Sequence, residues 1–367
     1  MRARQNEASE AIGAAKRSGD DAAEPITAMR EVAARVKEMQ ADVATVEERI
    51  RVVLATVPNI PEDGAPAEDA VLREWGEAGR AGVDHLELLG HLVDMEAGSR
   101  VAGARFAYLK GPLVLLELAL VRWAIEELSA HGFTPVIPPV LVREEALFGT
   151  GFLPDTEQQI YSVPDDDLYL VGTSEVPLAA LHAGEIVESD RLPLRYAGFS
   201  SCFRREAGAA GKDTRGIFRV HQFDKVEMFA FVDPEQSAGE HERLLAIEEQ
   251  LLQALEIPYR VVDIAASDLG ASAARKYDLE AWLPGQERFR ELTSCSNTTD
   301  YQARRLDARC RADGGGPRHL HTLNGTAVAV GRTIIALVEN HARGEGVIEI
   351  PEVLQRFGAP GEIGAAI

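Results

Sequence analysis

Charged and polar side chains are concentrated in residues 199–229, FSSCFRREAGAAGKDTRGIFRVHQFDKVEMF. Arg204 and Glu206 are two residues apart, a glycine-rich charged loop follows, and the chain returns through Gln222 to Glu227. In an extended strand residues i and i+2 point to the same face, so Arg204 and Glu206 share one face. A cation beside an acceptor suits a ligand with a phosphate at one end and a donor-bearing base at the other. A surface hairpin with solvated charges would show the same pair, so other segments must decide.

Three further segments settle which chemistry the pair serves. They are VGTSEVP at 171–177, RELTSCSNTTDYQARR at 290–305 and HTLNGTAVAVGRTIIALVEN at 321–340. Segment 199–229 resembles motif 2 of the class II aminoacyl-tRNA synthetases, in the form found in seryl-tRNA synthetases of the bacterial type. The other three resemble that family's Thr-x-Glu substrate loop, its metal-ligand strand and its motif 3, in the family's order. The resemblance extends over residues 6–357.

The resemblance implies an ATP site around Arg204. Adenylation is an in-line displacement at the α-phosphate, so catalysis consists of positioning and charge neutralisation. Arg204 is expected at the α-phosphate, because a guanidinium can bind two of its oxygens at once. The implied ATP-binding residues are Arg204, Arg205, Glu206, Phe218, Val220, Glu291, Leu292, Thr293, Ser294 and Arg332, of which Arg204, Glu291 and Arg332 are the expected catalytic residues.

Within this site the resemblance assigns individual contacts. Glu206 would accept from the adenine amino group, while Phe218 and Arg332 would cover opposite faces of the base. An ordinary core aromatic at Phe218 and a structural ion pair at Arg332 are the alternatives. Glu291 and Ser294 match the family's Mg²⁺ ligands, and hard oxygen ligands suit that ion. Strict strand alternation would put these two on opposite faces, so we expect the strand to end or bulge between them.

The same resemblance implies a site for serine. The expected serine-binding residues are Thr173, Ser174, Glu175, Arg204, Glu227 and Thr326. Thr173 and Glu175 share one face of an extended segment, and the family uses this pair near the substrate ammonium. Glu227 is the family's contact to serine, and a carboxylate that accepts a buried hydroxyl rejects the analogue lacking it by roughly 10⁴–10⁵. Thr326 stands where many relatives have serine.

The elements that hold these residues indicate an α+β fold. Residues 111–131 form an amphipathic helix pattern, and Pro135, Pro138 and Pro139 exclude a central strand after it. This pair of elements resembles motif 1, the family's dimer interface, which implies a homodimer. A second helix is expected at 234–256 and short strands at 259–264 and 277–283. We therefore expect a class II catalytic domain over residues 84–367, built on a mainly antiparallel sheet flanked by helices.

The N-terminal part has a heptad pattern over residues 25–57, which is typical of a two-stranded coiled coil. It resembles the return helix of the helical hairpin with which seryl-tRNA synthetases grip their tRNA. The helix expected before it, within residues 6–17, is much shorter than its partner. We therefore expect residues 1–57 to form a partial tRNA-binding arm, and either Met1 not to be the native start or the chain to be a fragment. A self-associating or body-packed coil is the alternative. Residues 58–83, rich in Pro, Gly and acids, are expected to be a linker.

Composition limits the cellular setting. The apolar stretch at 112–125 is broken by Glu117 and Arg122, so it predicts a buried helix face and no membrane span. Three cysteines without a C-x-x-C pair indicate a reducing cytoplasm and no zinc site. The formal charge of −21 is unfavourable for RNA binding, although acids and bases nearly cancel in the first 56 residues.

The sequence thus favours a serine–tRNA ligase that uses L-serine, ATP with Mg²⁺, and tRNA(Ser). Some relatives also charge tRNA(Sec), which the resemblance allows here. Two alternatives stay open: an amino acid:carrier-protein ligase, which lacks the arm, and a catalytically inactive synthetase paralogue. The heptads oppose the first alternative, and the intact charged residues of the four segments oppose the second.

Overall fold

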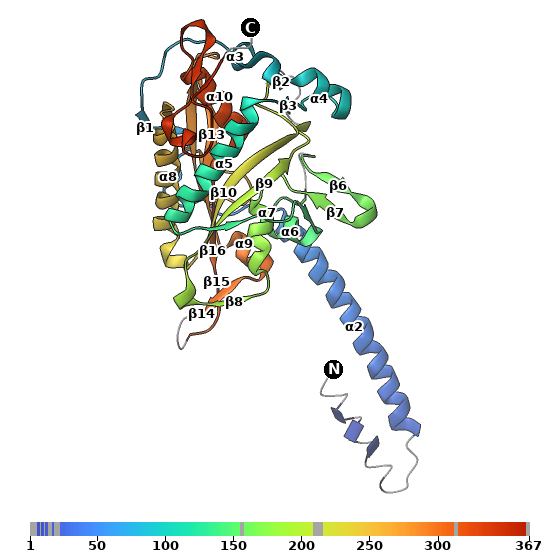
Figure 1. Ribbon diagram of the computed structural model, residues 1–367. Helices are drawn as coiled ribbons and strands as arrows, with labels where there is room; N and C mark the ends of the chain where they lie inside the picture. The colour runs from blue at the N-terminus through green and yellow to red at the C-terminus, as the bar shows by residue number, and fades with distance from the viewer. Residues whose placement is uncertain are drawn as a thin grey trace. The chain divides into compact units, whose positions relative to one another are not determined.

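The structure is a computed structural model, and it describes residues 6–7, 9–10, 12–13, 17, 23–154, 158–207, 216–311 and 315–364. Contacts divide the chain into two compact units, Met1–Val57 and Pro58–Ile367. Figure 1 shows both units with their helices and strands. None of the helices in the described ranges combines the length and the apolar character that crossing a membrane requires.

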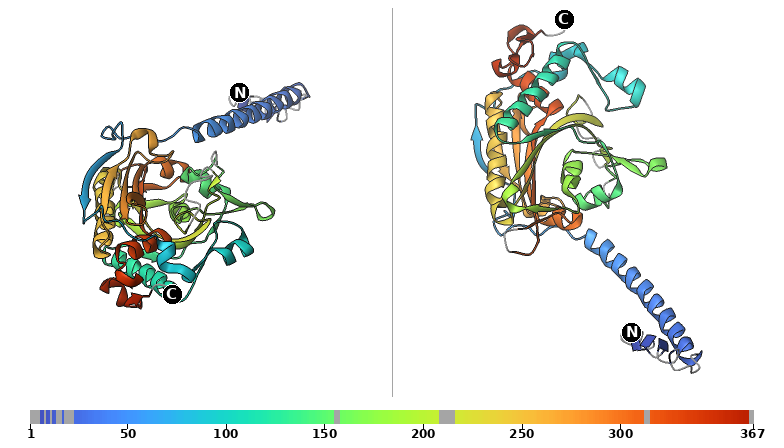
Figure 2. Two further views of the ribbon diagram at one scale, coloured as in Figure 1. Left: turned by 90° about the horizontal axis from the view of Figure 1, so that it is seen from above. Right: turned by 60° about the horizontal axis from the view of Figure 1, so that its bottom comes forward.

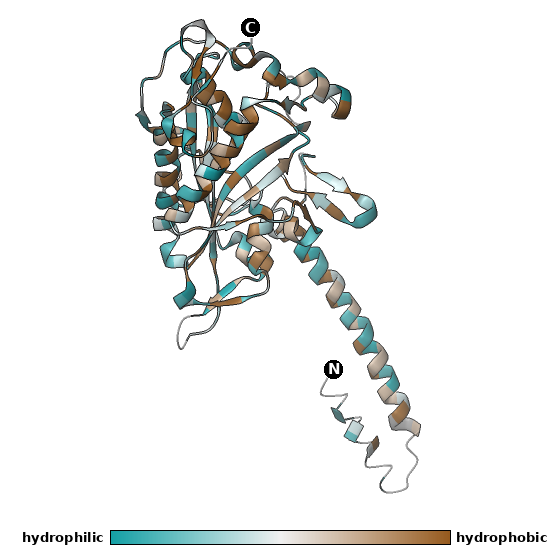
Figure 3. Cartoon of the chain, viewed as in Figure 1, coloured by the Kyte–Doolittle hydropathy of each residue, from teal (hydrophilic) through white to brown (hydrophobic). Residues whose placement is uncertain are grey.

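The first unit contains one long helix, α2 (Ala23–Ala55). Its heptad positions Val43, Val46 and Ile50 are each about half exposed, at 53%, 51% and 52%. Figure 3 shows apolar and polar residues interspersed along this helix. Residues 8, 11 and 14–16 of the predicted partner helix and the connection at 18–22 lie outside the described residues, so the coiled coil stays a prediction.

The second unit is built on an eight-stranded sheet with the order β1-β11-β12-β13-β16-β10-β9-β4. All pairs are antiparallel except β4 with β9. The predicted mainly antiparallel α+β fold is therefore confirmed. In sheet order the strands are β1 (Ala70–Trp75), β11 (Tyr259–Asp263), β12 (Arg275–Leu283), β13 (Arg288–Thr299), β16 (His321–Ala329), β10 (Gln222–Val232), β9 (Leu194–Phe203) and β4 (Thr134–Val136).

The strands at both edges of this sheet are short or irregular. The proline-rich segment provides β4, an edge strand as the prolines require. At the opposite edge, β1 lies inside the segment expected to be a linker and pairs with β11. Residues 58–83 thus do more than connect the units, because the apolar and aromatic residues of β1 outweigh the turn-forming composition around them.

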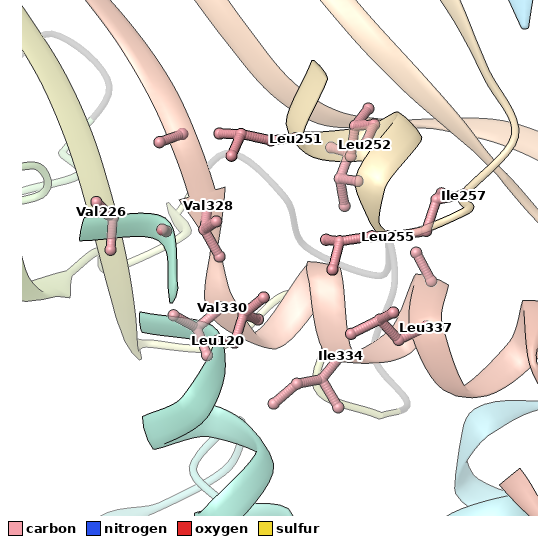
Figure 4. Close-up of a cluster of buried hydrophobic side chains, with 14 of the residues drawn as sticks. Leu120, Val226, Leu251, Leu252, Leu255, Ile257, Val328, Val330, Ile334 and Leu337 are labelled. Carbon is pink, nitrogen blue, oxygen red and sulfur yellow. The ribbon is translucent and has the colours of Figure 1, made fainter. Parts of the chain in front are cut away.

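Three helices cover one face of the sheet: α5 (Pro112–Ala130), α8 (Ser237–Ala254) and α10 (Val330–Asn340). Figure 2 shows α8 along this face. Strand β10 alternates, so Val226, Met228 and Ala230 join the core beneath these helices. Figure 4 shows Val226 in this core with leucines of α8 and α10. The opposite side of the same strand therefore carries Lys225 and Glu227 away from the helices.

The other face carries smaller elements and the cavity described below. Helices α7 (Glu175–Ala179) and α9 (Tyr301–Leu306) pack against it over a second apolar cluster that includes Phe229 and Phe231. The remaining helices and strands are α3 (His85–Leu89), α4 (Met95–Ala102), α6 (Glu144–Thr150), α11 (Glu352–Gln355), β2 (Val93–Asp94), β3 (Tyr108–Leu109), β5 (Leu141–Val142), β6 (Tyr161–Val163), β7 (Leu168–Leu170), β8 (Ile186–Glu188), β14 (Arg309–Arg311), β15 (Arg318–His319), β17 (Ile348–Glu349) and β18 (Glu362–Ile363).

Candidate active site

A cavity of about 320 Å³ lies on the face of the sheet opposite α8, and the start of α10 also contributes to its lining. It brings together most of the residues expected from the four segments. Those that line it are Thr173, Glu175, Arg204, Glu206, Phe218, Val220, Glu227, Glu291, Leu292, Thr293, Ser294, Thr326 and Arg332. Residues from four distant parts of the sequence thus meet at one surface, which is what a joint site for two substrates requires.

Two of the expected residues do not line the cavity. Ser174 is fully buried and its hydroxyl donates to the Gly198 carbonyl at 3.4 Å. Arg205 is exposed, and its backbone N–H donates to the Gln159 carbonyl at 2.8 Å. The expectation that their side chains contact serine and ATP is therefore not supported by their positions. Both lie next to residues that line the cavity. The segment 173–175, expected to be extended, turns into α7 at Ser174, whose φ and ψ of −68° and −10° are helical.

The strand register places four polar residues in one row across the sheet. Asp278 is opposite Ser294, and Thr326 is opposite Glu227. Because Cys295 pairs with Gly325, Ser294 stands next to Thr326. The row therefore runs Asp278–Ser294–Thr326–Glu227, with adjacent strands about 4.8 Å apart. An expected metal ligand and the expected serine contacts are thus held by rigid strands side by side.

A β-bulge resolves the conflict between Glu291 and Ser294. Leu279 pairs with Thr293 while Glu280 pairs with Glu291, so Leu292 is the extra residue on β13. The added residue reverses the alternation, and both Glu291 and Ser294 line the cavity. The predicted irregularity is confirmed. Two oxygen ligands on one face fit Mg²⁺, which takes its other ligands from phosphates and water.

Cations surround the Glu291 carboxylate. Arg332 Nη1 lies 3.6 Å from Glu291 Oε1 and donates to the Glu291 carbonyl at 3.1 Å. Partial burial acts to raise the pKa of Glu291, but Arg332, Lys276, Arg204 and Arg219 outweigh it and lower the pKa below its usual value. The carboxylate is therefore ionised and available to a divalent cation at neutral pH.

Glu206 occupies a constrained position at the end of β9. Its φ is +51°, a left-handed conformation that is uncommon for a residue with a side chain. Its Oε2 accepts from Arg219 Nη1 at 2.7 Å, and Arg219 also lines the cavity. The Arg219 guanidinium holds the Glu206 carboxylate in place, and the carboxylate can still accept further hydrogen bonds. Backbone strain held by surrounding structure is typical of functional sites.

The aromatic surface for a base differs from the expected one. Arg332 Cζ lies 4.6 Å from the Phe218 ring centroid, and Arg290 Cζ lies 3.9 Å from it. To hold a base between them, the Phe218 ring and the Arg332 guanidinium would have to be about 7 Å apart, which is two van der Waals contacts. This arrangement therefore cannot hold a base without movement. Phe223, which also lines the cavity, has Arg204 Cζ at 5.4 Å from its ring and offers another stacking surface. The Phe218 expectation is not supported by this geometry.

At the other end of the cavity, Lys225 and Glu227 form a buried ion pair on β10. They are 6% and 2% exposed. Lys225 Nζ also donates to Thr173 Oγ1 at 2.7 Å. Among the described residues no donor hydrogen-bonds the Glu227 carboxylate beyond this ion pair, so it can accept from a ligand.

Glu175 is the second buried carboxylate of this end. Its Oε1 accepts from Gln302 Nε2 at 2.7 Å and from Asn324 Nδ2 at 3.1 Å. Burial and the nearby Glu227 raise the pKa of Glu175 to about 7, although Lys225 and Gln302 oppose this. Because both amides bind one oxygen, the Glu175 carboxylate has a fixed orientation. A cationic ligand beside it would favour its charged form.

One group of potential metal ligands lies apart from the cavity. Asp84, His85 and Glu339 come within 4.8 Å of one another. The Glu339 oxygens accept from the backbone N–H groups of His85 at 3.1 Å and Gly285 at 2.9 Å, and His85 Nδ1 lies 3.0 Å from Glu339. Through these bonds the Glu339 carboxylate links α3, α10 and the chain after β12. We therefore interpret the cluster as structural.

Comparison with known proteins identifies the family. The profile described as tRNA synthetase class II core domain (G, H, P, S and T) matches residues 160–341, and that of the seryl-tRNA synthetase N-terminal domain matches residues 1–61. The serine–tRNA ligase of Streptomyces coelicolor is 50% identical, over 97% of this chain and 86% of the relative. The chain belongs to the seryl-tRNA synthetase family.

Other members of the seryl-tRNA synthetase family agree in sequence and structure. The serine–tRNA ligase of Thermobifida fusca is 52% identical, over 89% of this chain and 80% of its own length. The crystal structure of the seryl-tRNA synthetase from Pyrococcus horikoshii complexed with ATP has a TM-score of 0.91 and 42% identity, covering 100% of this chain and 89% of that one. The resemblance stated from the motifs is thus confirmed.

Several cavity residues of this seryl-tRNA synthetase family member escaped the sequence analysis. They are Arg219, Phe223, Lys225, Lys276 and Asn324. Gln302, which contacts Glu175 from behind the cavity lining, also escaped it. Lys225 and Glu227 repeat the i, i+2 spacing of Arg204 and Glu206, so the signal that first drew attention could have found Lys225. Gln302 lies in the quoted segment 290–305 but on α9, and only the fold shows that α9 reaches Glu175.

Proposed function

We propose that the protein is a serine–tRNA ligase that activates L-serine with ATP and transfers the seryl group to tRNA(Ser). The observation that carries this proposal is the cross-strand row that puts Glu227 and Thr326 beside Ser294 in one cavity with Arg204. This arrangement supports a carboxylate that reads a small hydroxyl amino acid next to a site for phosphates. Relatives at 50% identity carry the same activity in their names.

In the first step the serine carboxylate oxygen attacks the α-phosphorus, and the bond to the β-phosphate oxygen breaks to release pyrophosphate. Arg204 would bind the α-phosphate and neutralise charge that develops there. Its Nε donates to the Gly172 carbonyl at 3.1 Å, which leaves the terminal nitrogens free of that bond. Glu291 and Ser294 would hold Mg²⁺, which supplies charge neutralisation on the triphosphate.

The base and its stacking partners follow from the same geometry. Glu206, fixed by Arg219, would accept from the adenine amino group. Val220 would contact the nucleotide, and Phe223 would provide the aromatic surface in place of Phe218. Arg332 would lie near the phosphates and the metal, since it already contacts Glu291.

At the amino acid end, Glu227 would accept from the serine hydroxyl with Thr326 beside it. Glu175 would bind the ammonium, because an ionised carboxylate is the favourable partner for that group. Thr173 completes this end through its contact with Lys225. The pocket thus pairs two carboxylates with the two donors that serine offers.

The second step requires tRNA(Ser), and the seryl-tRNA synthetase N-terminal profile over residues 1–61 supports this partner. A related structure, of A. aeolicus tRNASec in complex with M. kandleri SerRS, is 20% identical and shows likeness of fold alone, so charging of tRNA(Sec) is left to experiment. We further propose a homodimer through α5, whose Val114, Leu115 and Leu118 are 41%, 52% and 59% exposed. A cytoplasmic location stays the prediction made from the cysteines.

Serine-dependent exchange between ATP and pyrophosphate tests the proposal, followed by charging of tRNA(Ser). We expect both activities in the unmodified protein. Arg204→Ala should abolish exchange, while Arg73→Ala, which removes an exposed arginine paired with Glu249 elsewhere, should leave it unchanged. Absence of exchange would favour an inactive paralogue, and exchange without tRNA charging would favour a carrier-protein ligase.

A further inference from the structure

Lys225 is the cation closest to the proposed serine contact, and the proposed function gives it no role. It lies on β10 two residues before Glu227, lines the cavity and is 6% exposed. A lysine is rarely buried to this degree unless it is paired. Its two described contacts are the ion pair with Glu227 and the hydrogen bond to Thr173.

The ion pair holds the Glu227 carboxylate in place. Glu227 is 2% exposed, and Lys225 Nζ contacts its Oε2. Removing one partner of a buried ion pair is strongly destabilising, so each group fixes the position of the other. A carboxylate only accepts hydrogen bonds, so Glu227 requires a donor from the amino acid, which serine has and alanine lacks.

The hydrogen bond determines the direction of the Thr173 hydroxyl. Thr173 Oγ1 accepts from Lys225 Nζ at 2.7 Å and from the Glu175 backbone N–H at 3.2 Å. A hydroxyl oxygen has two lone pairs, so both are used and the O–H can only donate. Thr173 therefore cannot accept from a substrate ammonium through its side chain, and that task is left to Glu175.

We propose that Lys225 is a specificity-determining positioning residue, which holds the Glu227 carboxylate in place and keeps the Thr173 hydroxyl donating, so that serine is selected over alanine. The inference rests on the proposed serine contact of Glu227. Lys225 acts through these two groups and does not contact the reacting atoms. Its removal should therefore reduce discrimination between the amino acids more than it reduces the use of ATP.

The test compares kcat/KM for serine and for alanine in ATP–pyrophosphate exchange, with KM for ATP measured beside them. Lys225→Met should lower the serine-to-alanine ratio at least tenfold, with less than a twofold change in KM for ATP. Lys110→Met, which breaks the Lys110–Asp94 ion pair outside the cavity, is the matched control and should leave the ratio unchanged. A Lys225→Met ratio within twofold of the unmodified protein would overturn the inference, as would equal losses with both amino acids.

A double-mutant cycle separates this inference from the proposed function and guards against misfolding. Glu227→Gln alone should lower the ratio, and if it does not, the serine contact itself is wrong. Lys225→Met added to Glu227→Gln leaves no unpaired buried charge, so the double variant should fold. We expect Lys225→Met to change the ratio much less in the Glu227→Gln background than in the unmodified protein, because only the contact of Lys225 with Thr173 is then left to lose. A further tenfold loss would show that Lys225 acts independently of Glu227 and would refute the inference.

Discussion

The pH dependence of serine activation is a direct consequence of where Glu175 lies. Its pKa is about 7, raised by burial and by Glu227, whereas an unperturbed glutamate has a value near 4.5. Binding of the serine ammonium requires the carboxylate, so the protonated enzyme should bind serine poorly. The group has a raised pKa, and serine binding is therefore lost as the pH falls through about 7 and retained above it.

The magnitude follows from the ionised fraction. With a pKa of 7, about 9% of Glu175 is ionised at pH 6 and about 91% at pH 8, a tenfold difference. With an unperturbed pKa the fraction would already be about 97% at pH 6, and the profile would be nearly flat. The assay is kcat/KM for serine in ATP–pyrophosphate exchange at saturating ATP, followed from pH 5.5 to 8.

Two variants should move the midpoint in opposite directions. Gln302 donates to Glu175 and lowers its pKa, so Gln302→Leu should shift the midpoint to higher pH. The charge of Glu227 raises that pKa, so Glu227→Gln should shift the midpoint to lower pH. Less than a twofold fall in kcat/KM between pH 8 and pH 6 would refute the reasoning, as would midpoints that both variants leave in place.

Three other predictions concern ATP, the fold and assembly. Phe223→Ala should remove about 1–3 kcal/mol of stacking energy and so raise KM for ATP roughly 5–150-fold, while KM for serine stays constant. An unchanged KM for ATP would return the stacking role to Phe218. Burial raises the pKa of Glu248 well above its usual value, which favours the neutral form, so Glu248→Gln should keep the melting temperature within about 2 °C; a larger fall would contradict this. Leu118→Asp on α5 should convert the proposed dimer to monomer in sedimentation, and a persisting dimer would place the interface elsewhere.

The motifs predicted the architecture and most of the cavity because their residues are fixed by strands. Glu227, Thr326 and Ser294 are held in register by β10, β16 and β13, and that register follows from alternation that the sequence displays. The bulge at Leu292 could be anticipated because Glu291 and Ser294 had to share a face. Its position could not, since a bulge depends on the partner strand β12.

The errors have a different physical origin. Ser174 lies between two cavity residues, and membership of a motif does not tell which way a side chain points. Phe218 and Phe223 are both aromatic residues of the same hairpin. Arg290 and Arg332 lie 3.9 and 4.6 Å from the Phe218 ring centroid, whereas Arg204 lies 5.4 Å from that of Phe223. Arg290 comes from a distant strand, so no local pattern in the hairpin could distinguish the two rings.

The charges within the cavity explain how a protein with a net charge of −21 can bind ATP. Arg204, Arg219 and Arg332 gather around Glu291, where the phosphates would lie. The two carboxylates that would bind the amino acid, Glu175 and Glu227, lie at the other end. There Lys225 contacts both Glu227 and Thr173. Charges a few ångströms from a ligand determine the electrostatic potential that it meets, because salt screens the more distant charges that make up the net charge. The serine ammonium and the ATP phosphates carry opposite charges, so the separation of sign favours one orientation for each bound substrate.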